Sequence, residues 1–592
     1  MWMPLTFLDV PGQVPSGHGK SGGAGMAHCP AQLRAVVAGA AGWLRAWWAA
    51  ACWCVRLHAQ FGVAAIEKLL GALPVVADFS SRLRIRDIVD DACPVRDLAG
   101  LTHGQVIEAL VANRLTSPAP LVHVGQWAQA WAVGETLGVE PALLNDDRIG
   151  RALDAIAPHL DRITGSVGVA AIETFGIDVT AMHWDMTSIS MHGEYEQNQE
   201  GFAAPKYGHP KDRRADLKQI QAGIAVSADG AIPVFHRAFD GGAGEVGQVI
   251  PVMKALQEMA TERRLLIIGD SKLISYANLA AMDGDGVGFV APASKTYVPA
   301  MQLAGLTLGQ AVKVGYVAQR DQAKPAARRG SWHVHEDSMS LAGPRKSDPA
   351  VALRRVFVHS SARAEAAANA HALKLQRARG DLERLDRGLG SRHYPNQDKV
   401  NARIAVIAKD RRADAYLRTQ TGTDPGTGKP TLAWRFDQEP IDAEAATDGW
   451  YALLTNLQPG HADAAQVLLL YKGQEAVERR YSAFKGPLAV AALYLKNNRR
   501  IAALITVICL ALLIFCLVER QVRQALTEQG QTKVEGLYAR RPAIPTGRLI
   551  FDALATMKII PGMGQSPPVI PQPTPLQLRL LDLLGIDPRR LR

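Results

Sequence analysis

Cysteine is scarce in this chain, which contains six Cys among 592 residues. No pair of them lies at the spacing of Cys and His ligands that a structural zinc site requires, so the sequence excludes a zinc-finger type of fold. We interpret all six as reduced thiols, which predicts a cytoplasmic protein. The sequence also lacks an evident internal repeat.

The pattern of residues 1–60 is not the one we expect of a secretory leader. The apolar stretch from Ala35 to Val55 is interrupted by Arg45, and no small-residue cleavage site follows it. We therefore treat residues 1–60 as an N-terminal extension that the rest of the sequence does not explain, with Met26 as an alternative first residue.

Hydrophobic residues make up 48% of the chain, which is the content of a folded protein, and the length is sufficient for several domains. The chain has 66 Lys and Arg against 56 Asp and Glu, a formal net charge of +10. This excess favours an acidic partner, either nucleic acid or a lipid surface.

Two stretches predict strands that carry an acid. In AMHWDMTSISMHG the side chains alternate between two faces, so Asp185 and Thr187 share a face. In LLIIGDSK the apolar run from Leu265 to Ile268 predicts a buried strand, and Asp270 follows its carboxyl end, where open α/β sheets bind ligands. Two plainer readings are an edge-strand position for Asp185 and a helix N-cap for Asp270.

The stretch YKGQEAVERRYSAFK predicts one helix with an acid at the edge of a core. Its polar and aromatic side chains fall at alternating steps of three and four, and so form one stripe: Tyr471, Gln474, Glu478, Tyr481 and Lys485. Val477 and Phe484 lie beside the stripe and predict an apolar flank. A carboxylate beside a core usually has a partner or a chemical role, although most Glu residues on charged helices are simply solvated.

The same stretch resembles the Tyr-x2-Arg-x3-Glu-x6-Lys signature of the IS-four type branch of DDE transposases from bacterial insertion sequences. Tyr471, Glu478 and Lys485 match in register, whereas Gln474 stands where the family has Arg. Asp185 and Thr187 match the family's Asp-x-Thr element. The resemblance extends from about residue 70 to residue 586.

The resemblance implies an α/β fold with a ribonuclease-H-like catalytic core. Asp185, Asp270 and Glu478 would be the catalytic acids and would bind two ions of Mg²⁺ or Mn²⁺. Support would come from Thr187, Tyr471, Gln474 and Lys485. The implied activity is cleavage of insertion-sequence ends and their joining to target DNA. A related metal-dependent nuclease and an inactive transposase copy remain alternatives.

The implied domain order follows the family. Residues 61–175 would form a helical domain that binds transposon ends, and the alternative is a helical packing domain without a DNA role. The first part of the core would span residues 176–293, a β-rich insertion residues 294–466, and the catalytic helix with a closing apolar helix residues 467–530. Residues 531–592 would be a Pro-rich linker and a terminal helix.

The implied partner is double-stranded DNA, both as inverted-repeat ends and as target. The residues that we expect to contact it are Lys211, Arg213, Arg214, Arg479 and Arg480. Bringing two ends together implies a homodimer. The resemblance also implies a bacterial protein that is cytoplasmic and associated with the nucleoid.

A competing signal is the uncharged run from Ile501 to Val518, which reaches the minimum length of a membrane span. It leaves open a membrane-anchored binding protein. Charges flank the run on both sides without the usual asymmetry, so we expect instead a helix that is buried against the sheet, with no membrane partner.

Overall fold

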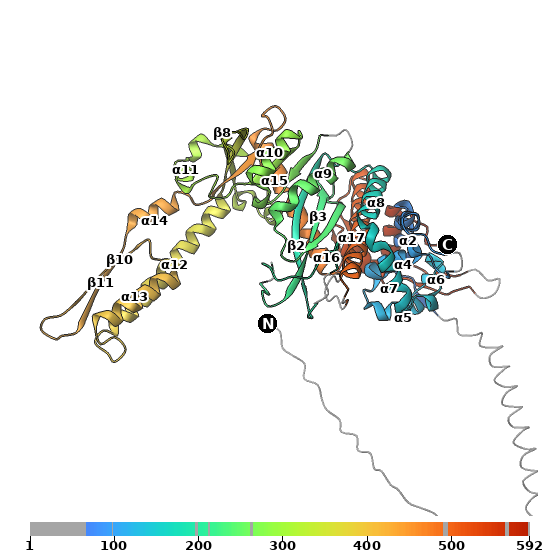
Figure 1. Cartoon of the computed structure of the whole chain (residues 1–592), viewed down its shortest axis with the longest axis horizontal. Helices are drawn as coiled ribbons and strands as arrows, with labels where there is room; N and C mark the ends of the chain where they lie inside the picture. The colour runs from blue at the N-terminus through green and yellow to red at the C-terminus, as the bar shows by residue number, and fades with distance from the viewer. Residues whose placement is uncertain are drawn as a thin grey trace, which may run out of the picture. The chain divides into compact units, whose positions relative to one another are not determined.

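The computed structural model describes residues 67–96, 99–195, 199–210, 213–260, 264–488, 495, 497–562 and 568–589. By its internal contacts the chain divides into Met1–Ile66 and Glu67–Arg592, and every described residue belongs to the second unit (Figure 1). The predicted extension over residues 1–60 and the predicted DNA contact Lys211 lie outside the described residues.

A mixed sheet of nine strands organises the second unit. Its order is β4-β3-β2-β5-β6-β12-β9-β8-β7. The strands β2, β3 and β4 are antiparallel neighbours, β5 and β6 run parallel to β2, and the remaining neighbours pair antiparallel. The bounds are β2 (Ala181–Met191), β3 (Lys218–Ser227), β4 (Pro233–Asp240), β5 (Leu266–Ile268), β6 (Gly288–Pro292), β7 (Val312–Val314), β8 (Trp332–Leu341), β9 (Val351–Ser360) and β12 (Trp450–Thr455).

The acid-bearing strand β2 lies inside this sheet, between β3 and β5, so its side chains are largely buried on both faces. Trp184 contacts Phe239 edge-on, with ring centroids 6.4 Å apart. Gly223 on β3 leaves room for that indole, because an added Cβ would lie 2.1 Å from it. This packing excludes the plain reading of Asp185 as a residue of an edge strand.

Helices precede the sheet, as predicted for residues 61–175. They are α2 (Leu73–Arg82), α3 (Ile85–Ala92), α4 (His103–Thr116), α5 (Val124–Ala130), α6 (Val133–Leu137), α7 (Asp146–Ile156) and α8 (Leu160–Phe175). A capping box of Thr102 and Gln105 starts α4. Their apolar side chains belong to the same core cluster as those of the sheet, so the change at residue 175 is one of secondary structure within a single compact unit.

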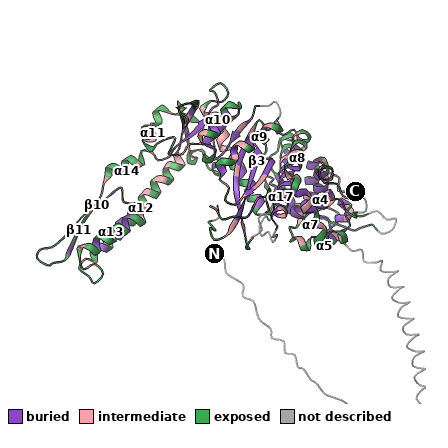
Figure 2. Ribbon diagram, viewed as in Figure 1, coloured by how far each residue is buried: buried purple, intermediate pink, exposed green. Residues whose placement is uncertain are grey.

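The apolar run forms α17 (Asn498–Glu528), a helix of 31 residues with a mean hydropathy of 3.2 over its most apolar window. By length and composition it is able to cross a membrane, but all of that window is buried inside the protein (Figure 2). The flanking charges have partners: Arg499 and Arg500 both bind Asp154 of α7, at 2.8 and 2.7 Å. The prediction of a buried helix is confirmed.

The predicted insertion, residues 294–466, divides into two parts. The strands β7, β8, β9 and β12 extend the central sheet, which the sequence did not predict. The remainder has hydrophobic clusters of its own, in which Trp434 packs edge-on against Phe436 at 5.7 Å. It comprises α12 (Ser361–Arg387), α13 (Gln397–Arg411), the hairpin of β10 (Leu417–Thr423) and β11 (Pro430–Phe436), and α14 (Gln438–Ala445).

The C-terminal residues pack on the helical part of the core. In residues 531–592, where a linker and one helix were predicted, the structure has β13 (Val534–Tyr538), β14 (Arg541–Ala543), α18 (Gly547–Leu554), β15 (Lys558–Ile559) and α19 (Pro575–Leu584). Strand β15 pairs with β1 (Lys68–Leu69), and α19 contacts α17. The other helices are α9 (Val249–Ala260), α10 (Tyr276–Gly284), α11 (Ala300–Ala304), α15 (Ala464–Lys472) and α16 (Glu475–Lys485).

Buried His236 on β4 predicts a loss of stability in acid. Burial lowers its pKa to about 3, and its Nε2 lies 3.2 Å from the hydroxyl of Thr164. Because an unfolded His has a pKa near ~6.5, the unfolded state takes up the proton first. The contribution is therefore complete above about pH 6.5 and is lost as the pH falls toward 3.

We expect His236→Gln to remove up to about 1.4 kcal/mol per pH unit from the slope of the unfolding free energy between about pH 6.5 and 5. Urea unfolding at stepped pH measures this slope. The exposed control His192→Gln should keep the wild-type slope. Equal slopes for wild type and His236→Gln would contradict the buried, neutral state of this imidazole.

Candidate active site

Asp185 on β2 and Asp270, just beyond the end of β5, occupy matched positions along two neighbouring parallel strands. His183 on β2 pairs with Ile268 at the end of β5, and each Asp lies two residues beyond its member of this pair. Side chains two residues apart on a strand lie on the same face, and neighbouring strands are only about 4.8 Å apart. The sheet register therefore brings together two acids that are 85 positions apart in the sequence.

Both acids line one small pocket, with a volume of about 10 Å³, together with Glu245 and Lys272. Asp270 follows β5 and caps the short helical turn Ser271–Leu273, where its Oδ1 accepts the backbone N–H of Lys272 at 2.9 Å. The predicted capping role of Asp270 is therefore present beside its place in the pocket. Asp185 Oδ1 accepts the N–H of Met186 at 2.8 Å.

Glu245 and Lys272 were not singled out from the sequence. Glu245 begins the turn before α9 and is nine-tenths buried, and its Oε2 lies 2.6 Å from Nζ of Lys272. That hydrogen bond is the largest influence that raises the pKa of Lys272, and the charges of Glu245, Asp270 and Asp185 add to it. The only sequence feature that could have identified Lys272 was its position two residues after Asp270.

The predicted single helix over Tyr471–Lys485 is wrong, because the structure divides it into α15 and α16. At the junction Gln474 and Val477 donate their N–H groups to carbonyls three residues earlier, which tightens the turn. Gly473 lies against the ring of His183, and an added Cβ would be 2.7 Å from that ring. The close approach to β2 thus explains both the glycine and the break.

Gln474 anchors this junction to the acid-bearing strand. Its Oε1 lies 3.1 Å from Nδ1 of His183, and its Nε2 donates to the carbonyl of Trp184 at 3.2 Å. Burial lowers the pKa of His183 to about 4, so this imidazole is neutral at pH 7. The amide therefore holds the residues directly before Asp185, which differs from the phosphate contact expected at this position of the signature.

Tyr481 makes a second connection from α16 to β2. Its hydroxyl donates to the carbonyl of Asp185, and it lies 3.3 Å from the carbonyl of Ala222 on β3. Burial, and then the charge of Asp185, raise the pKa of this phenol well above its usual value. The helix that carries Glu478 is thus bonded to the strand that carries Asp185.

Glu478 itself is exposed on α16 and is not among the residues that line the pocket of Asp185 and Asp270. Within the part of the chain that the structure describes, no three His, Cys, Asp or Glu side chains form a group that could hold a metal ion. Tyr471 responds to both acids: burial raises its pKa, and the charges of Asp270 and then Glu478 add to the rise. The structure brings two of the predicted acids together and leaves the third on the neighbouring helix.

The supporting residues are partly in place. Thr187 is buried on β2, on the same face as Asp185, and Lys485 is exposed at the end of α16.

Lys472 was not singled out from the sequence, and its ammonium lies 4.0 Å from the ring centroid of Trp332. The ring centroids of Tyr451 and Tyr471 lie 5.6 and 5.8 Å from the same ammonium. Burial lowers the pKa of Lys472 to about 8. These rings hold the end of α15 on the sheet.

The prediction that Arg480 contacts DNA is wrong. Its side chain is buried, donates to the carbonyls of Ala231 and Gly230 at 2.9 and 2.8 Å, and pairs with Glu519 of α17 at 3.2 Å. Arg479, one position earlier, is exposed and donates to Gln319 at 2.9 Å. Only Arg479 of the two therefore faces solvent beside Glu478.

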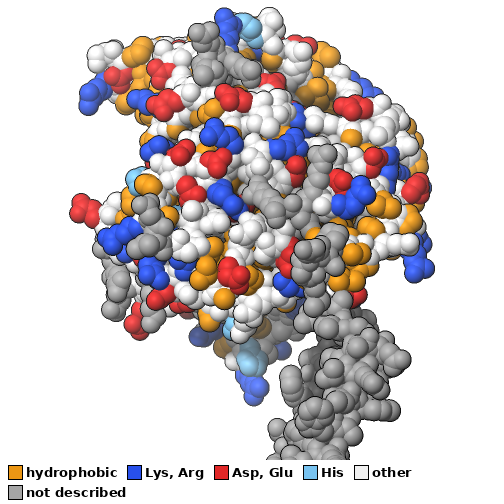
Figure 3. All heavy atoms as spheres, turned by 90° about the vertical axis from the view of Figure 1, so that its right-hand side faces the viewer, with side chains coloured by type: hydrophobic (Ala, Val, Ile, Leu, Met, Phe, Trp, Pro, Cys, Tyr) orange, Lys and Arg blue, Asp and Glu red, His pale blue; other side chains and the backbone are white. Residues whose placement is uncertain are grey.

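Two described residues that were expected to contact DNA lie in the basic loop after β2, and they differ in their surroundings. Arg213 is exposed and adopts a positive φ of 64°. Arg214 is also exposed, and its guanidinium pairs with Asp216 at 2.7 Å. On the face of the molecule that Figure 3 draws, acidic and basic side chains are interspersed.

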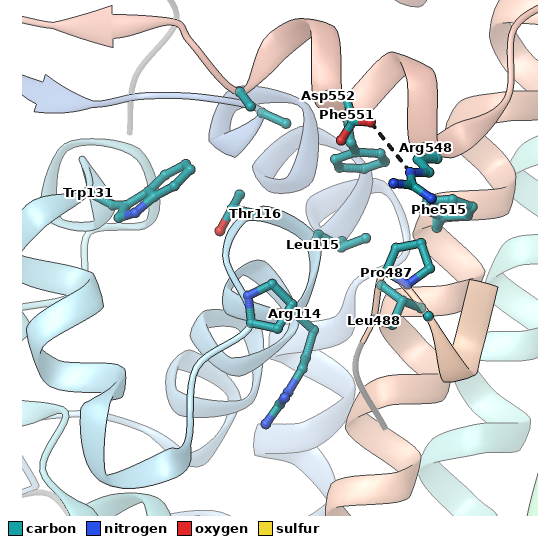
Figure 4. A pocket seen from close by; sticks show the side chains of 14 residues that line it. Arg114, Leu115, Thr116, Trp131, Pro487, Leu488, Phe515, Arg548, Phe551 and Asp552 are labelled. Carbon is teal, nitrogen blue, oxygen red and sulfur yellow. Dashed lines mark ion pairs between the residues drawn. The ribbon is translucent and has the colours of Figure 1, made fainter. Parts of the chain in front are cut away.

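A larger cavity lies away from the acids. It has a volume of about 410 Å³ and is lined by residues of α4, α17 and α18, among them Leu115, Phe515 and Phe551 (Figure 4). Its one ion pair between lining residues joins Arg548 to Asp552 at 3.6 Å, and in Figure 4 the side chain of Arg114 extends away from them. None of the predicted site residues lines it.

Comparison with known proteins gives limited matches. Residues 65–160 match a family model described as a domain of unknown function, DUF4277. No curated protein matches the chain. Among solved structures, similarity is found to a cryo-EM structure of the piggyBac transposase synaptic complex with hairpin DNA, at 8% identity and a TM-score of 0.35, over 81% of this chain and 79% of that one.

A second similar structure is a Mos1 transposase paired-end complex with the left transposon end, at 13% identity and a TM-score of 0.14, over 36% of this chain and 63% of that one. Both TM-scores are low. Neither similarity therefore carries an inference about the function of this chain.

The close approach of Gly473 to His183 predicts that Gly473→Ala destabilises the protein by about 1–3 kcal/mol, since the added methyl must push the α15–α16 junction away from β2. Gly460→Ala is the control, because an added Cβ there meets nothing within 4 Å. Urea unfolding of both variants measures the difference. Equal stabilities would show that the junction does not depend on this approach.

Proposed function

We propose that this protein is a DDE transposase, which cleaves insertion-sequence ends and joins them to target DNA by metal-dependent phosphoryl transfer. The observation that carries the proposal is the pair of Asp185 and Asp270, which line one pocket, the first on β2 and the second just after the parallel strand β5. The helix with Glu478 is bonded to the first of these strands through Tyr481. The alternatives are a related metal-dependent nuclease and an inactive copy.

The strand arrangement supports a ribonuclease-H-like core. Such a core begins with an acid-bearing strand followed by two antiparallel strands, and places its fourth strand beside the first. Here β2, β3 and β4 are antiparallel neighbours, and β5 lies beside β2 and parallel to it. The further strands on the other edge come from the segment that separates β6 from α15.

The donor set suits a hard divalent ion. Asp185 and Asp270 would hold Mg²⁺ or Mn²⁺ through carboxylate oxygens, and Mg²⁺ is usually bound by one or two carboxylates together with water and substrate phosphates. Exposed Glu478 would complete the set when DNA occupies the site. Two bound ions would activate a water or a 3′-hydroxyl and stabilise the leaving oxygen.

The chain's own side chains would orient the substrate. Lys485 and Arg479 lie exposed on the helix that carries Glu478, so a phosphate on that surface can reach their charges. Tyr471, whose pKa is raised by burial and by the charges of both Asp270 and Glu478, would contact the phosphate nearest the pocket. Gln474 and Tyr481 keep α16 in position, and buried Thr187 supports Asp185 from the same strand face.

The partners follow from the reaction. The substrates would be duplex transposon ends and target DNA, and pairing two ends would require at least a homodimer, which we place in the bacterial cytoplasm at the nucleoid. Strand joining separates a transposase from a nuclease, since a nuclease cuts the duplex without transferring its 3′ end.

Replacing any of the three acids should abolish cleavage. We expect Asp185→Asn, Asp270→Asn and Glu478→Gln each to lower the rate at least about 100-fold, because each removes a charge on which transition-state stabilisation depends. The assay incubates duplex DNA from the flanks of the gene with the purified full chain and Mg²⁺ or Mn²⁺. Cleavage and joining of that DNA are measured.

Binding of the same duplex should survive in all three variants, because phosphate contacts supply most of the affinity. The matched control is Asp283→Asn, an exposed acid on α10. Full activity of any one of the acid variants would remove that residue from the proposed site, and full activity of all three would refute the proposal.

The basic loop predicts how binding responds to salt. Replacing Lys211, Arg213 and Arg214 together by Ala should reduce the slope of log affinity against log salt by about one for each DNA phosphate that the loop no longer neutralises. The existing pair of Arg214 with Asp216 should make its share the smallest. Fluorescence anisotropy over a salt series measures the slope, with Arg345→Ala plus Lys346→Ala as an exposed control. A slope equal to wild type would place the DNA elsewhere.

A further inference from the structure

Lys272 is the one basic side chain that lines the acidic pocket. Its backbone N–H is fixed by Asp270, and its ammonium is bound at 2.6 Å by Glu245, which is nine-tenths buried and lines the same pocket. The short turn from Asp270 to Lys272 thus carries both a predicted metal ligand and a permanent cation. This arrangement places a positive charge beside Asp185 and Asp270 without any bound ion.

The pocket is small and Lys272 borders it. A volume of about 10 Å³ is roughly that of a single water position, so a hydrated divalent ion does not fit beside the present arrangement. Glu245 is held inside the protein, whereas just over half of the Lys272 side chain is exposed. Of the two partners, Lys272 is therefore the one whose side chain can turn toward solvent.

The side chains that line the pocket carry more negative than positive charge. Three carboxylates, those of Asp185, Glu245 and Asp270, line the pocket together with one ammonium, so the pocket attracts cations, and Lys272 already satisfies part of that attraction. A divalent ion entering the pocket would be repelled by the ammonium at short range. A DNA phosphate near the pocket would offer Lys272 an alternative partner.

We propose that Lys272, held by Glu245, is a built-in competitor of the divalent ion and couples metal binding to DNA binding. This inference rests on the proposed function. In the absence of DNA, Lys272 weakens the affinity of Asp185 and Asp270 for the ion. When a phosphate draws Lys272 out of the pocket, the ion binds more tightly, and by reciprocity the ion strengthens DNA binding. Lys272 therefore acts on the reaction indirectly, through the binding of the ion and of the DNA.

The test measures Mn²⁺ binding to the full chain without DNA. The electron paramagnetic resonance signal of the free ion gives the amount that remains unbound. Lys272→Met, which keeps the length of the side chain and removes its charge, should bind Mn²⁺ about tenfold more tightly than wild type. Lys272→Arg keeps the charge and should stay close to wild type. Lys254→Met, an exposed lysine on α9, is the matched control and should also be unchanged.

A second measurement adds a DNA duplex to the same titrations. Wild type should gain Mn²⁺ affinity on adding duplex, and Lys272→Met should gain less, because its competing charge is already absent. If Lys272→Met binds Mn²⁺ as wild type does, while Asp185→Asn abolishes binding, the inference is overturned and the proposed function stands. If Asp185→Asn and Asp270→Asn leave Mn²⁺ binding intact, the proposed metal site fails and the inference fails with it.

Discussion

The buried ion pair between Arg480 and Glu519 is the interaction on which the position of the candidate site depends. It joins α16 to α17 at 3.2 Å, and both side chains are almost fully buried. Arg480 also binds the carbonyls of the β3–β4 turn, and Glu519 accepts the N–H of Gly547 at the start of α18 at 2.8 Å. Losing one partner of such a pair typically costs about 3–5 kcal/mol, because the other charge stays buried without compensation.

This pair explains why one short helix carries both structural and exposed polar residues. Facing inward, Val477, Tyr481 and Phe484 are buried beside Arg480. Facing outward, Glu478, Arg479 and Lys485 are exposed. Because the inward face is bonded to β2 and α17, the outward face has a fixed direction relative to Asp185. An acid on an exposed helix surface is thereby kept near the sheet without being buried itself.

The apolar helix α17 has a comparable role on a larger scale. It contacts α4, α7, β4 and α19, and so joins the N-terminal helices, the sheet and the C-terminal residues in one core. Its charged ends bind Asp154 and Asp229 within the same unit. A segment that resembles a membrane span by composition is here a central packing element, since its neighbours come from the N-terminal helices, the sheet and the C-terminal residues.

Local sequence patterns determined most of the regular elements. Alternation predicted β2, the continuous apolar run predicted β5, and Asp270 was placed at the carboxyl end of that strand, because side-chain period and turn residues act over a few positions. The same patterns did not reveal β8. They also did not reveal the division of the helix at Gly473, since that break depends on His183, which is distant in the chain. Only the tertiary structure decided that Gln474 and Arg480 bind protein groups and that Lys272 meets Glu245, because contacts between residues far apart follow from packing and not from spacing.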